Sequence, residues 1–443
     1  MEERWSTEHV LSLAPDAPSR KAAGKLSAPA PWSGTGTGGG ALWGECRGSG
    51  STPYRTVVEL ATPAYRCSCP SRKFPCKHAL GLLLLWSGSP EAVPAAAEPA
   101  DWAADWLTER QERTEQAAGR RTAKAEAAAA DPAAARRRAE KRSARVAAGA
   151  QELRLRLADR IRHGLADAST APDAWEEVAA RMIDAQAPGL ATRVRELSHT
   201  PQPELLEEYA MLHLLATAYG RVDDLPGALG ATVRARVGFT TDTAELLTGP
   251  TVRDRWQVLG ARDTSDERLT TRRLWLRGAK TGRAALLLAF GRPGQAPDLA
   301  LPTGHLLEAE LAFHPGARPL RAVLGTRYGA PEPSGTGAAP AGFGPAEAMA
   351  GYGEAVADDP WLEAWPTVLS GVVPVHDVDG WHLTDGRHTL PVHRAGATDP
   401  ALWRLAAVSG GRPVTLFGEC GHRGFTPITV WDEQGRPTGL TSA

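Results

Sequence analysis

The stretch that decides the fold of the N-terminal region runs Arg66-Cys67-Ser68-Cys69-Pro70-Ser71-Arg72-Lys73-Phe74-Pro75-Cys76-Lys77-His78. It holds three of the five cysteines of the chain. Two thiolates one residue apart, a six-residue loop, and then a thiolate and an imidazole one residue apart offer the four ligands that tetrahedral zinc prefers. We predict that Cys67, Cys69, Cys76 and His78 bind one structural Zn²⁺.

The spacing also predicts the local backbone around these ligands. An extended Cys-x-Cys segment presents both side chains on one side, because strand residues i and i+2 share a face. Residues i and i+2 of a regular helix do not share a face. We therefore expect Cys76 just before a helix and His78 in its first turn, with Pro75 favouring an extended Phe74. The apolar run from Ala79 to Trp86 would be that helix.

The same residues resemble a known family. Cys-x-Cys, a loop and Cys-x-His, within Cys67-Ser68-Cys69-Pro70-Ser71 and Pro75-Cys76-Lys77-His78-Ala79-Leu80, look like the bacterial form of the SWIM zinc finger. The resemblance covers roughly residues 1 to 90. It implies a small ββα zinc module with a DNA-binding or protein-interaction role, and it does not imply an enzyme. Some bacterial relatives resemble partners of MoxR-type ATPases, so an ATPase partner is a further implication. A phosphate loop of the Gly-x4-Gly-Lys-Ser/Thr type is absent from this sequence, and such a motor would be a separate chain.

Two other cysteines allow alternative interpretations. Cys46 is a candidate extra ligand, but its place before a predicted hairpin turn favours a small core thiol. Cys420-Gly421-His422 is half a metal site without a neighbouring cysteine, and we predict a structural role for it. A redox role for the cluster is disfavoured, because its spacing differs from the Cys-x-x-Cys pair.

Cations surround the predicted ligands, and no acidic residue lies between Leu60 and Pro90. Arg66, Arg72, Lys73 and Lys77 could contact phosphate, while Phe74 and Tyr65 could stack on bases. The alternative is that the cations offset the net charge of −1 that three thiolates leave on a zinc site. Both DNA and another protein remain candidate partners.

Length and charge bound the rest of the chain. Its 443 residues predict two to four domains, and its net charge of −1 gives no global attraction to nucleic acid or membrane. We predict an α+β multidomain protein with a small ββα zinc module, a helical middle region and a mixed α/β C-terminal half. The expected parts are the zinc module at 1–90, a linker with charged Ala/Arg-rich helices at 91–170, a helical domain at 171–250, and a C-terminal region of unknown role at 251–443. The sequence shows no internal repeat.

A local basic field interrupts this neutral chain. From Arg110 to Arg162 there are 15 Lys or Arg against 7 Asp or Glu, in a stretch of helical bias broken at Pro132. The densest part holds the six cations Arg136, Arg137, Arg138, Lys141, Arg142 and Arg145. Arg138, Lys141, Arg142 and Arg145 share one helix face, and the repulsion among them favours either simple solvation or an acidic partner.

Two segments resemble catalytic or ligand-binding motifs, but their context favours a binding protein over an enzyme. Gly34 to Gly39 matches Gly-x-Gly-x-x-Gly, but it precedes a strand instead of following one, so we predict a flexible loop. A second cluster comprises His376, Asp377, Asp379, His382, Asp385 and His388. Its Asp-Gly dipeptides favour polar hairpins over a metal or acid–base site. We predict a zinc-binding interaction module that is not an enzyme; the alternative is an enzyme whose active site lies in the C-terminal half.

The segment from Met1 to Trp5 lacks the basic and apolar pattern of a secretory signal. The longest apolar run, Ala79 to Trp86, is much shorter than the roughly 18 residues that a membrane span needs. The sequence thus predicts a cytoplasmic protein without membrane association.

Overall fold

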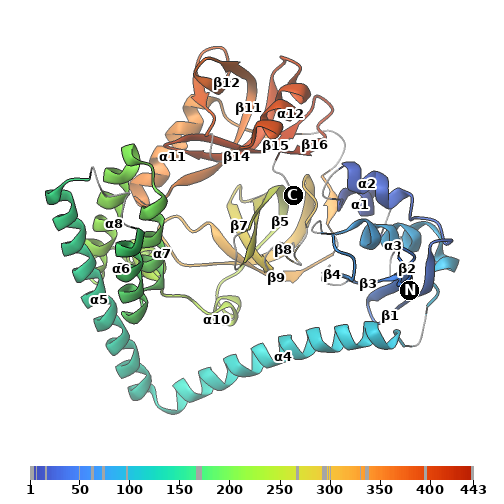
Figure 1. Cartoon of the computed structure of the whole chain (residues 1–443), viewed down its shortest axis with the longest axis horizontal. Helices are drawn as coiled ribbons and strands as arrows, with labels where there is room; N and C mark the ends of the chain where they lie inside the picture. Colours follow the sequence, from blue (N-terminus) through green and yellow to red (C-terminus); the bar gives the residue numbers. More distant parts are fainter. Residues whose placement is uncertain are drawn as a thin grey trace.

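This computed structural model describes residues 4–5, 7–14, 17–48, 50–60, 64–71, 75–95, 98–165, 172–265, 269–291, 297, 299, 301–329, 331–334, 339–393 and 397–440. Along the chain they form an N-terminal mixed module, two long helices, a helical bundle and a β-rich C-terminal half (Figure 1). The predicted α+β multidomain class is confirmed. The domain boundaries at residues 90, 170 and 250 stay predictions.

The N-terminal module is a four-stranded antiparallel sheet within the described ranges, in the order β1-β2-β3-β4. Its strands are β1 (Trp32–Gly38), β2 (Ala41–Cys46), β3 (Tyr54–Glu59) and β4 (Ala64–Cys67). The helices are α1 (Thr7–Ser12), α2 (Ala17–Gly24) and α3 (Lys77–Gly88). Helix α3 is apolar and buried from His78 to Trp86, so it forms the centre of this core. The predicted ββα unit corresponds to β3, β4 and α3, and β1, β2 and the two short helices enlarge it.

The prediction of a flexible loop at Gly34 to Gly39 was wrong. Most of that segment belongs to β1, which pairs with β2 through a register shift between Ser33 and Gly36. A Cβ at Gly36 would lie 2.6 Å from the ring of Trp43, so the glycine lets the strand approach that side chain. Low strand propensity was outweighed here by pairing and by packing on Trp43.

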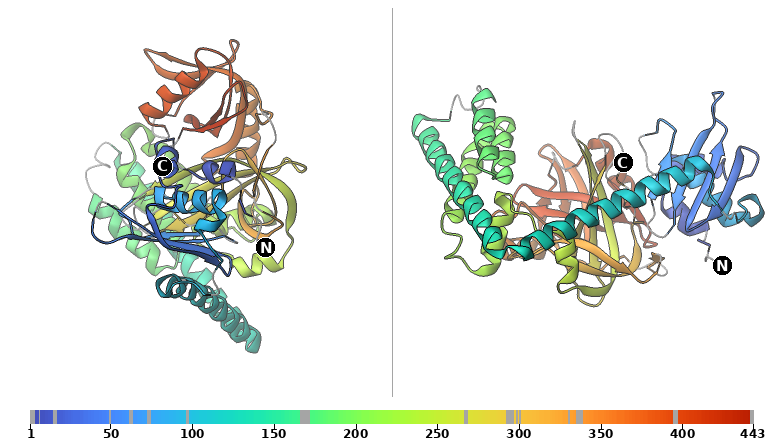
Figure 2. Two further views of the ribbon diagram at one scale, coloured as in Figure 1. Left: turned by 90° about the vertical axis from the view of Figure 1, so that its right-hand side faces the viewer. Right: turned by 90° about the horizontal axis from the view of Figure 1, so that it is seen from below.

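Two long helices lead away from the module: α4 (Asp101–Ala130) and α5 (Pro132–His163). They meet at Asp131, whose carboxylate caps α5 by accepting a hydrogen bond from the N–H of Ala134 at 2.8 Å. Pro132 occupies the first turn, where its missing N–H costs nothing. Figure 2 shows α4 running from the N-terminal module to the elbow with α5.

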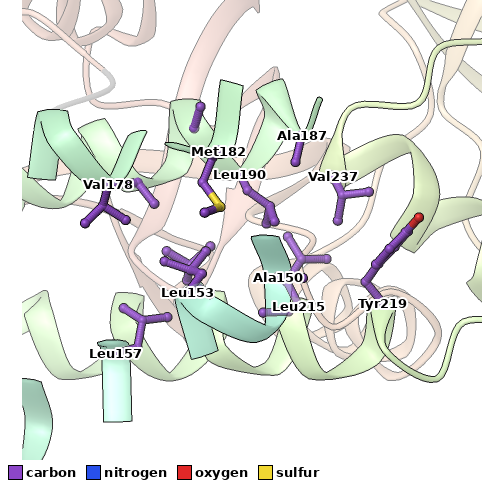
Figure 3. Packing of buried hydrophobic residues seen from close by; sticks show 14 of the residues in the cluster. Ala150, Leu153, Leu157, Val178, Met182, Ala187, Leu190, Leu215, Tyr219 and Val237 are labelled. Atoms are coloured by element: carbon purple, nitrogen blue, oxygen red, sulfur yellow. The ribbon is translucent and has the colours of Figure 1, made fainter. Parts of the chain in front are cut away.

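The second half of α5 joins a helical bundle. Val146, Ala150, Leu153 and Leu157 recur at helical spacing and are buried (Figure 3). They pack against α6 (Pro172–Asp184), α7 (Pro188–Glu196), α8 (Leu205–Tyr219) and α9 (Gly227–Val237). Short helical segments at Pro90–Ala92, Leu197–His199 and Gln202–Glu204 and helix α10 (Thr243–Thr248) complete the connections. Helices α6 to α10 lie within the range 171–250, where the sequence predicts a helical domain.

A closed barrel follows, which we call the first barrel. Its strands are β5 (Val252–Ser265), β6 (Thr270–Gly278), β7 (Ala284–Gly291), β8 (His305–Phe313) and β9 (Arg321–Arg327). Long β5 pairs with β8 through its first half and with β6 through its second half. The described pairings close the barrel, because β7 pairs in parallel with β9 and β9 pairs with β8. The two-residue strand β10 (Glu332–Pro333) extends β8 at the edge.

After helix α11 (Pro345–Asp358), the chain repeats this topology in a second barrel. Its strands are β11 (Ala364–Asp377), β12 (Gly380–Thr384), β13 (Thr389–Pro391), β14 (Val414–Gly421) and β15 (Gly424–Trp431), with α12 (Asp399–Ser409) before β14. Strand β11 pairs first with β14 and then with β12, as β5 does with β8 and β6. A parallel bridge between Val392 and Phe425 brings the third strand to the fifth. The short strand β16 (Pro437–Gly439) pairs with β15.

Numbered within each barrel, the strand order is 1-2-3-5-4-1 with strands 3 and 5 parallel. This is the topology of the oligonucleotide- and oligosaccharide-binding (OB) barrel, a five-stranded Greek-key barrel. In both copies the first strand has 14 residues and a register shift near its middle, beside Gly260 and Gly371. The sequence showed no internal repeat, whereas the described residues of the C-terminal half form a duplicated topology.

The two barrels pack directly on each other. Leu259, Trp275 and Leu286 on the outside of the first barrel contact Phe417 and the residues around it on the second. Gly260 permits this contact, because a Cβ there would lie 2.7 Å from side-chain atoms of β15. Among the helices of the described residues, none is both long and apolar enough to cross a bilayer.

Candidate metal centre

The β3–β4 hairpin positions the first two ligands. Cys67 is the last residue of β4 and lies opposite Thr56, whose Oγ1 is 3.2 Å from the sulfur of Cys67. Beyond the strand, the N–H of Ser68 donates to the carbonyl of Arg55 at 3.0 Å, and the hydroxyl of Ser68 accepts from the N–H of Arg55 at 3.0 Å. These bonds keep the chain extended through the Cys-x-Cys step, so Cys69 follows on the same side of the hairpin.

Helix α3 positions the other two ligands. Cys76 is its N-cap residue, with extended φ and ψ of −71° and 167°, and the N–H of Ala79 donates to the Cys76 sulfur at 3.4 Å. His78 is the second helical residue, and its ring lies 4.8 Å from that of Tyr54. The prediction that Cys76 precedes the helix and His78 occupies its first turn is confirmed. An N-terminal helix turn also favours negative charge on the Cys76 sulfur.

The four side chains converge. Ligand atoms of Cys67, Cys69, Cys76 and His78 all lie within 4.8 Å of one another, and the Cys67 sulfur is 3.7 Å from Nδ1 of His78. A tetrahedral site with zinc–sulfur bonds of about 2.3 Å requires neighbouring ligand atoms about 3.8 Å apart. Three sulfurs and one nitrogen form a donor set typical of structural zinc. The four residues form one zinc site.

The protonation of the thiols explains why this cluster needs a cation. Hydrogen bonds with the thiols of Cys67 and Cys69 raise the pKa of Cys76, and burial raises it further. The thiols of Cys67 and Cys76 donate to Cys69 and hold its pKa far below the ordinary value. Three adjacent sulfurs therefore carry one negative charge easily and further charges at a high cost. A divalent cation would stabilise all three thiolates and release their protons.

Cys46 and Cys420 lie outside this group of ligands, as predicted. Cys46 is buried in β2, and burial raises the pKa of its thiol, which favours a neutral core side chain. The sulfur of Cys420 lies 3.5 Å from that of Met349 in the second barrel. His422 instead contacts the hydroxyl of Tyr352 and the carboxylate of Glu207, at 3.2 Å each.

The predicted contact residues around the zinc site have different surroundings. Arg66 forms an exposed ion pair with Glu109 of α4, at 3.8 Å. Lys77 is exposed at the start of α3. Arg72, Lys73 and Phe74 lie outside the described residues. Tyr65 is buried, so the prediction that it stacks on exposed bases was wrong.

The cluster of histidines and aspartates in the C-terminal half forms two hairpins. Asp379-Gly380 turns between β11 and β12, and Asp385-Gly386 lies between β12 and β13. His382 faces Asp377 at 3.5 Å, while His388 faces Asp385 at 3.7 Å. Among the described residues, the zinc cluster is the one group of His, Cys, Asp or Glu side chains placed to hold a metal ion. The hairpin interpretation is confirmed.

Sequence reasoning missed the side chains that support the ligands. Thr56 contacts the Cys67 sulfur and Tyr54 packs on the His78 ring. Both come from β3, which the linear ligand pattern does not include. The register of the β3–β4 hairpin was the available signal, because it places Thr56 directly opposite Cys67.

The fold and the ligand set define a zinc-finger module with a sheet on one side of the metal and a helix on the other. A sequence model of the SWIM zinc finger matches residues 54–86, and a model of the SWIM-associated four-helix bundle domain matches residues 141–237. The chain contains a SWIM zinc finger followed by a SWIM-associated four-helix bundle domain. Neither a curated protein nor a solved structure matches it.

Proposed function

We propose that this chain is a non-enzymatic interaction protein that binds nucleic acid through a basic face on α5, while zinc stabilises its N-terminal module. The observation that carries the proposal is a set of exposed cations on the first half of α5. The set, called the α5 basic face below, comprises Arg137, Arg138, Lys141 and Arg145, which lie on one side of the helix. None of them has a carboxylate partner among the described residues.

This face differs from the other charged surfaces of the chain. Several exposed arginines elsewhere are paired with a nearby carboxylate, as in Arg162 with Asp159 at 2.7 Å and Arg221 with Asp224 at 3.7 Å. Arg142, beside them on α5, is partly buried over the ring of Phe239 at 4.2 Å. The one acidic residue between Arg136 and Arg145 is Glu140.

Electrostatics favours a polyanion as the partner. Like charges three or four residues apart on a helix each destabilise it by about 0.2–0.5 kcal/mol. From Arg138 to Arg145 the cations extend over about 10 Å of the helix axis. Duplex DNA carries one charge per roughly 1.7 Å of its axis, so phosphates can neutralise several of these side chains at once. Relief of the repulsion that destabilises free α5 then contributes favourably to the free energy of binding.

The tandem OB topology is consistent with this proposal, although a fold alone does not assign a function. The non-enzymatic part rests on the two separate His–Asp pairs described above. Each pair lies within its own hairpin, and the two hairpins differ. None of the four residues lines the large cleft described below.

A salt titration with matched variants tests the proposal. The triple variant R137Q/R138Q/R145Q removes three cations from the α5 basic face. The control R162Q/R221Q/R436Q removes three arginines of similar exposure that pair with neighbouring aspartates. Binding of fluorescein-labelled duplex and single-stranded oligonucleotides is measured by anisotropy over a range of salt concentrations.

We expect the wild type and the control to lose affinity steeply with salt. Each lost phosphate contact lowers the slope by about 0.9 for duplex or 0.7 for single strands. The α5 variant should therefore show a slope reduced by about 2 to 3. If the wild type binds neither oligonucleotide and instead captures a protein in a salt-resistant complex, the nucleic-acid proposal is wrong.

A further inference from the structure

The helical bundle, the first barrel and the second barrel lie next to one another (Figure 1). Residues of all three line a large cleft. Its volume is about 1200 Å³, and it is open to solvent. One wall comes from β5, β6 and the loop of residues 314–320 between β8 and β9. The other walls come from α7 to α9 and from the β14–β15 hairpin.

The first-barrel wall contains a pair of like charges. Arg262 on β5 and Arg273 on β6 are direct cross-strand partners. Like charges placed opposite each other destabilise a sheet unless an anion lies between them. Glu419 of β14 supplies one carboxylate, 3.0 Å from Arg273 and 3.9 Å from Arg262. The same carboxylate accepts a hydrogen bond from the indole N–H of Trp275 at 3.1 Å. One buried carboxylate thus offsets two guanidinium groups, and a positive charge is left over.

The loop between β8 and β9 adds to this wall. Arg321, the first residue of β9 after this loop, is exposed and has no carboxylate partner among the described residues. His314, at its start, and His393 from the second barrel also line the cleft. Burial lowers the pKa of both imidazoles. The nearby charge of Arg321 lowers the pKa of His314 further, and those of Arg423 and Arg262 lower the pKa of His393 further. Both rings are neutral at pH 7 and can donate and accept hydrogen bonds.

Most carboxylates of the opposite wall are already paired. Glu363 contacts Arg193 of α7, and Glu204 and Glu208 contact Arg423 at 2.8 Å and 2.9 Å. The lining holds eight arginines and six Asp or Glu residues, but Arg234 and Arg318 pair with Asp223 and Asp358, which do not line it, so the charges balance overall. Within the cleft the positive charge is concentrated on the first-barrel wall, where Arg262 and Arg273 share the single carboxylate of Glu419.

We propose that this cleft binds a short segment of single-stranded nucleic acid, with its phosphates against Arg262, Arg273 and Arg321. The inference rests on the proposed function and specifies where and in which form nucleic acid binds. OB barrels bind extended oligonucleotides on the face of strands 2 and 3 and on the loop between strands 4 and 5. In the first barrel, strand 2 is β6 and this loop is residues 314–320, and both line the cleft.

The size of the cleft favours a single strand. Small-molecule sites usually measure about 300–1,000 Å³, and this cleft exceeds that range. It can therefore hold several nucleotides of one strand. The two neutral imidazoles provide hydrogen-bonding groups for exposed base edges.

The test compares two double variants. R262Q/R321Q removes two cations of the wall and leaves the Arg273–Glu419 pair intact, so no buried carboxylate loses its main partner. The control R162Q/R221Q makes the same charge change at exposed, paired arginines elsewhere. Anisotropy with a short labelled oligothymidylate gives the salt dependence of binding, and thermal melting monitors folding. For single strands, loss of two phosphate contacts should lower the slope by about 1.4.

A gain of affinity offers an independent readout. E419Q keeps the shape of the side chain and removes the carboxylate that competes with phosphate. We expect tighter binding of the oligothymidylate by E419Q, and no tighter binding if Glu419 has a purely structural role. Photo-crosslinking with 4-thiothymidine should label peptides that contain residues 314–321.

The outcomes separate the two proposals. If the wild type binds no oligonucleotide, the proposed function and this inference both fail. If the wild type binds and R137Q/R138Q/R145Q weakens binding, while R262Q/R321Q keeps the full slope and crosslinks map elsewhere, the cleft inference alone is wrong.

Discussion

Loss of zinc should unfold the N-terminal module and leave the rest of the chain folded. Domains are stable by about 0.05–0.15 kcal/mol per residue, so a module of some 90 residues has a total stability of about 5–13 kcal/mol. Structural zinc contributes on the order of 10–16 kcal/mol in isolated fingers. The metal therefore accounts for most or all of the module's stability, even though α3 is buried along most of its length.

The structure defines how far the unfolding should extend. Ala103 and Trp106 at the start of α4 pack against Trp43, Val57 and Ala64 of the module's sheet. Those turns of α4 lose their support when the sheet unfolds. The bundle core around α5 makes no contact with this cluster, so residues 146–237 should keep their protection.

Hydrogen–deuterium exchange on the full chain, with and without a chelator, measures this directly. Cys69→Ser should reproduce the chelated state, with less than stoichiometric zinc by elemental analysis and fast exchange in α3 and the first turns of α4. Cys420→Ala removes a buried thiol from the second barrel and should retain one zinc and a protected α3. Slow exchange of α3 in the chelated protein would refute the reasoning, as would full zinc content in Cys69→Ser.

Three further predictions concern packing and charge. Trp106→Ala should weaken the contact between α4 and the sheet by about 3–5 kcal/mol and speed exchange in the first turns of α4, with zinc content unchanged. Burial would raise the pKa of Asp254, but hydrogen bonds from Thr281 and neighbouring N–H groups outweigh it and lower that pKa. Asp254→Asn should therefore cost about 1–3 kcal/mol in urea melts at neutral pH; the difference should shrink as the pH falls below about 3.9, the pKa of an unfolded aspartate, and vanish only below the lowered pKa of the folded carboxylate. Gly260→Ala should destabilise the contact between the barrels and lower the melting temperature, because its Cβ would lie 2.7 Å from side chains of β15; Gly351→Ala, at an open position in α11, should be neutral or stabilising by about 0.5–1 kcal/mol.

The zinc site could be predicted from the sequence because its geometry is local. Cys67 and Cys69 are two residues apart on an extended segment, and Cys76 and His78 flank a helix start. Short spacings of this kind determine which side chains can meet, almost independently of the remaining fold. The supporting contact from Thr56 is less local, since it depends on the register of a hairpin.

The barrels could not be predicted, because their identity lies in the order in which strands pair. Strands such as β7 contain apolar runs that the sequence shows. However, the parallel pairing of β7 with β9 joins segments more than 30 residues apart. Nothing in the local pattern of Ala284 to Phe290 specifies that partner. Gly260 and Gly371 occupy matching positions because each lies beside the register shift of the first strand of its barrel, and strand pairing defines that shift.

The placement of charge on separate parts of the chain yields one last prediction. The α5 basic face and a wall of the cleft belong to the same helical bundle, because the second half of α5 packs against α6 to α9. The zinc module lies at the other end of α4, a helix of 30 residues and thus about 45 Å long. A strand bound to α5 and the cleft therefore needs no contribution from the zinc site. Cys69→Ser should bind oligothymidylate with an unchanged salt slope, measured by anisotropy. A loss of that binding would show that the zinc module forms part of the nucleic-acid surface, and the assignment of binding to the bundle and barrels would have to be abandoned.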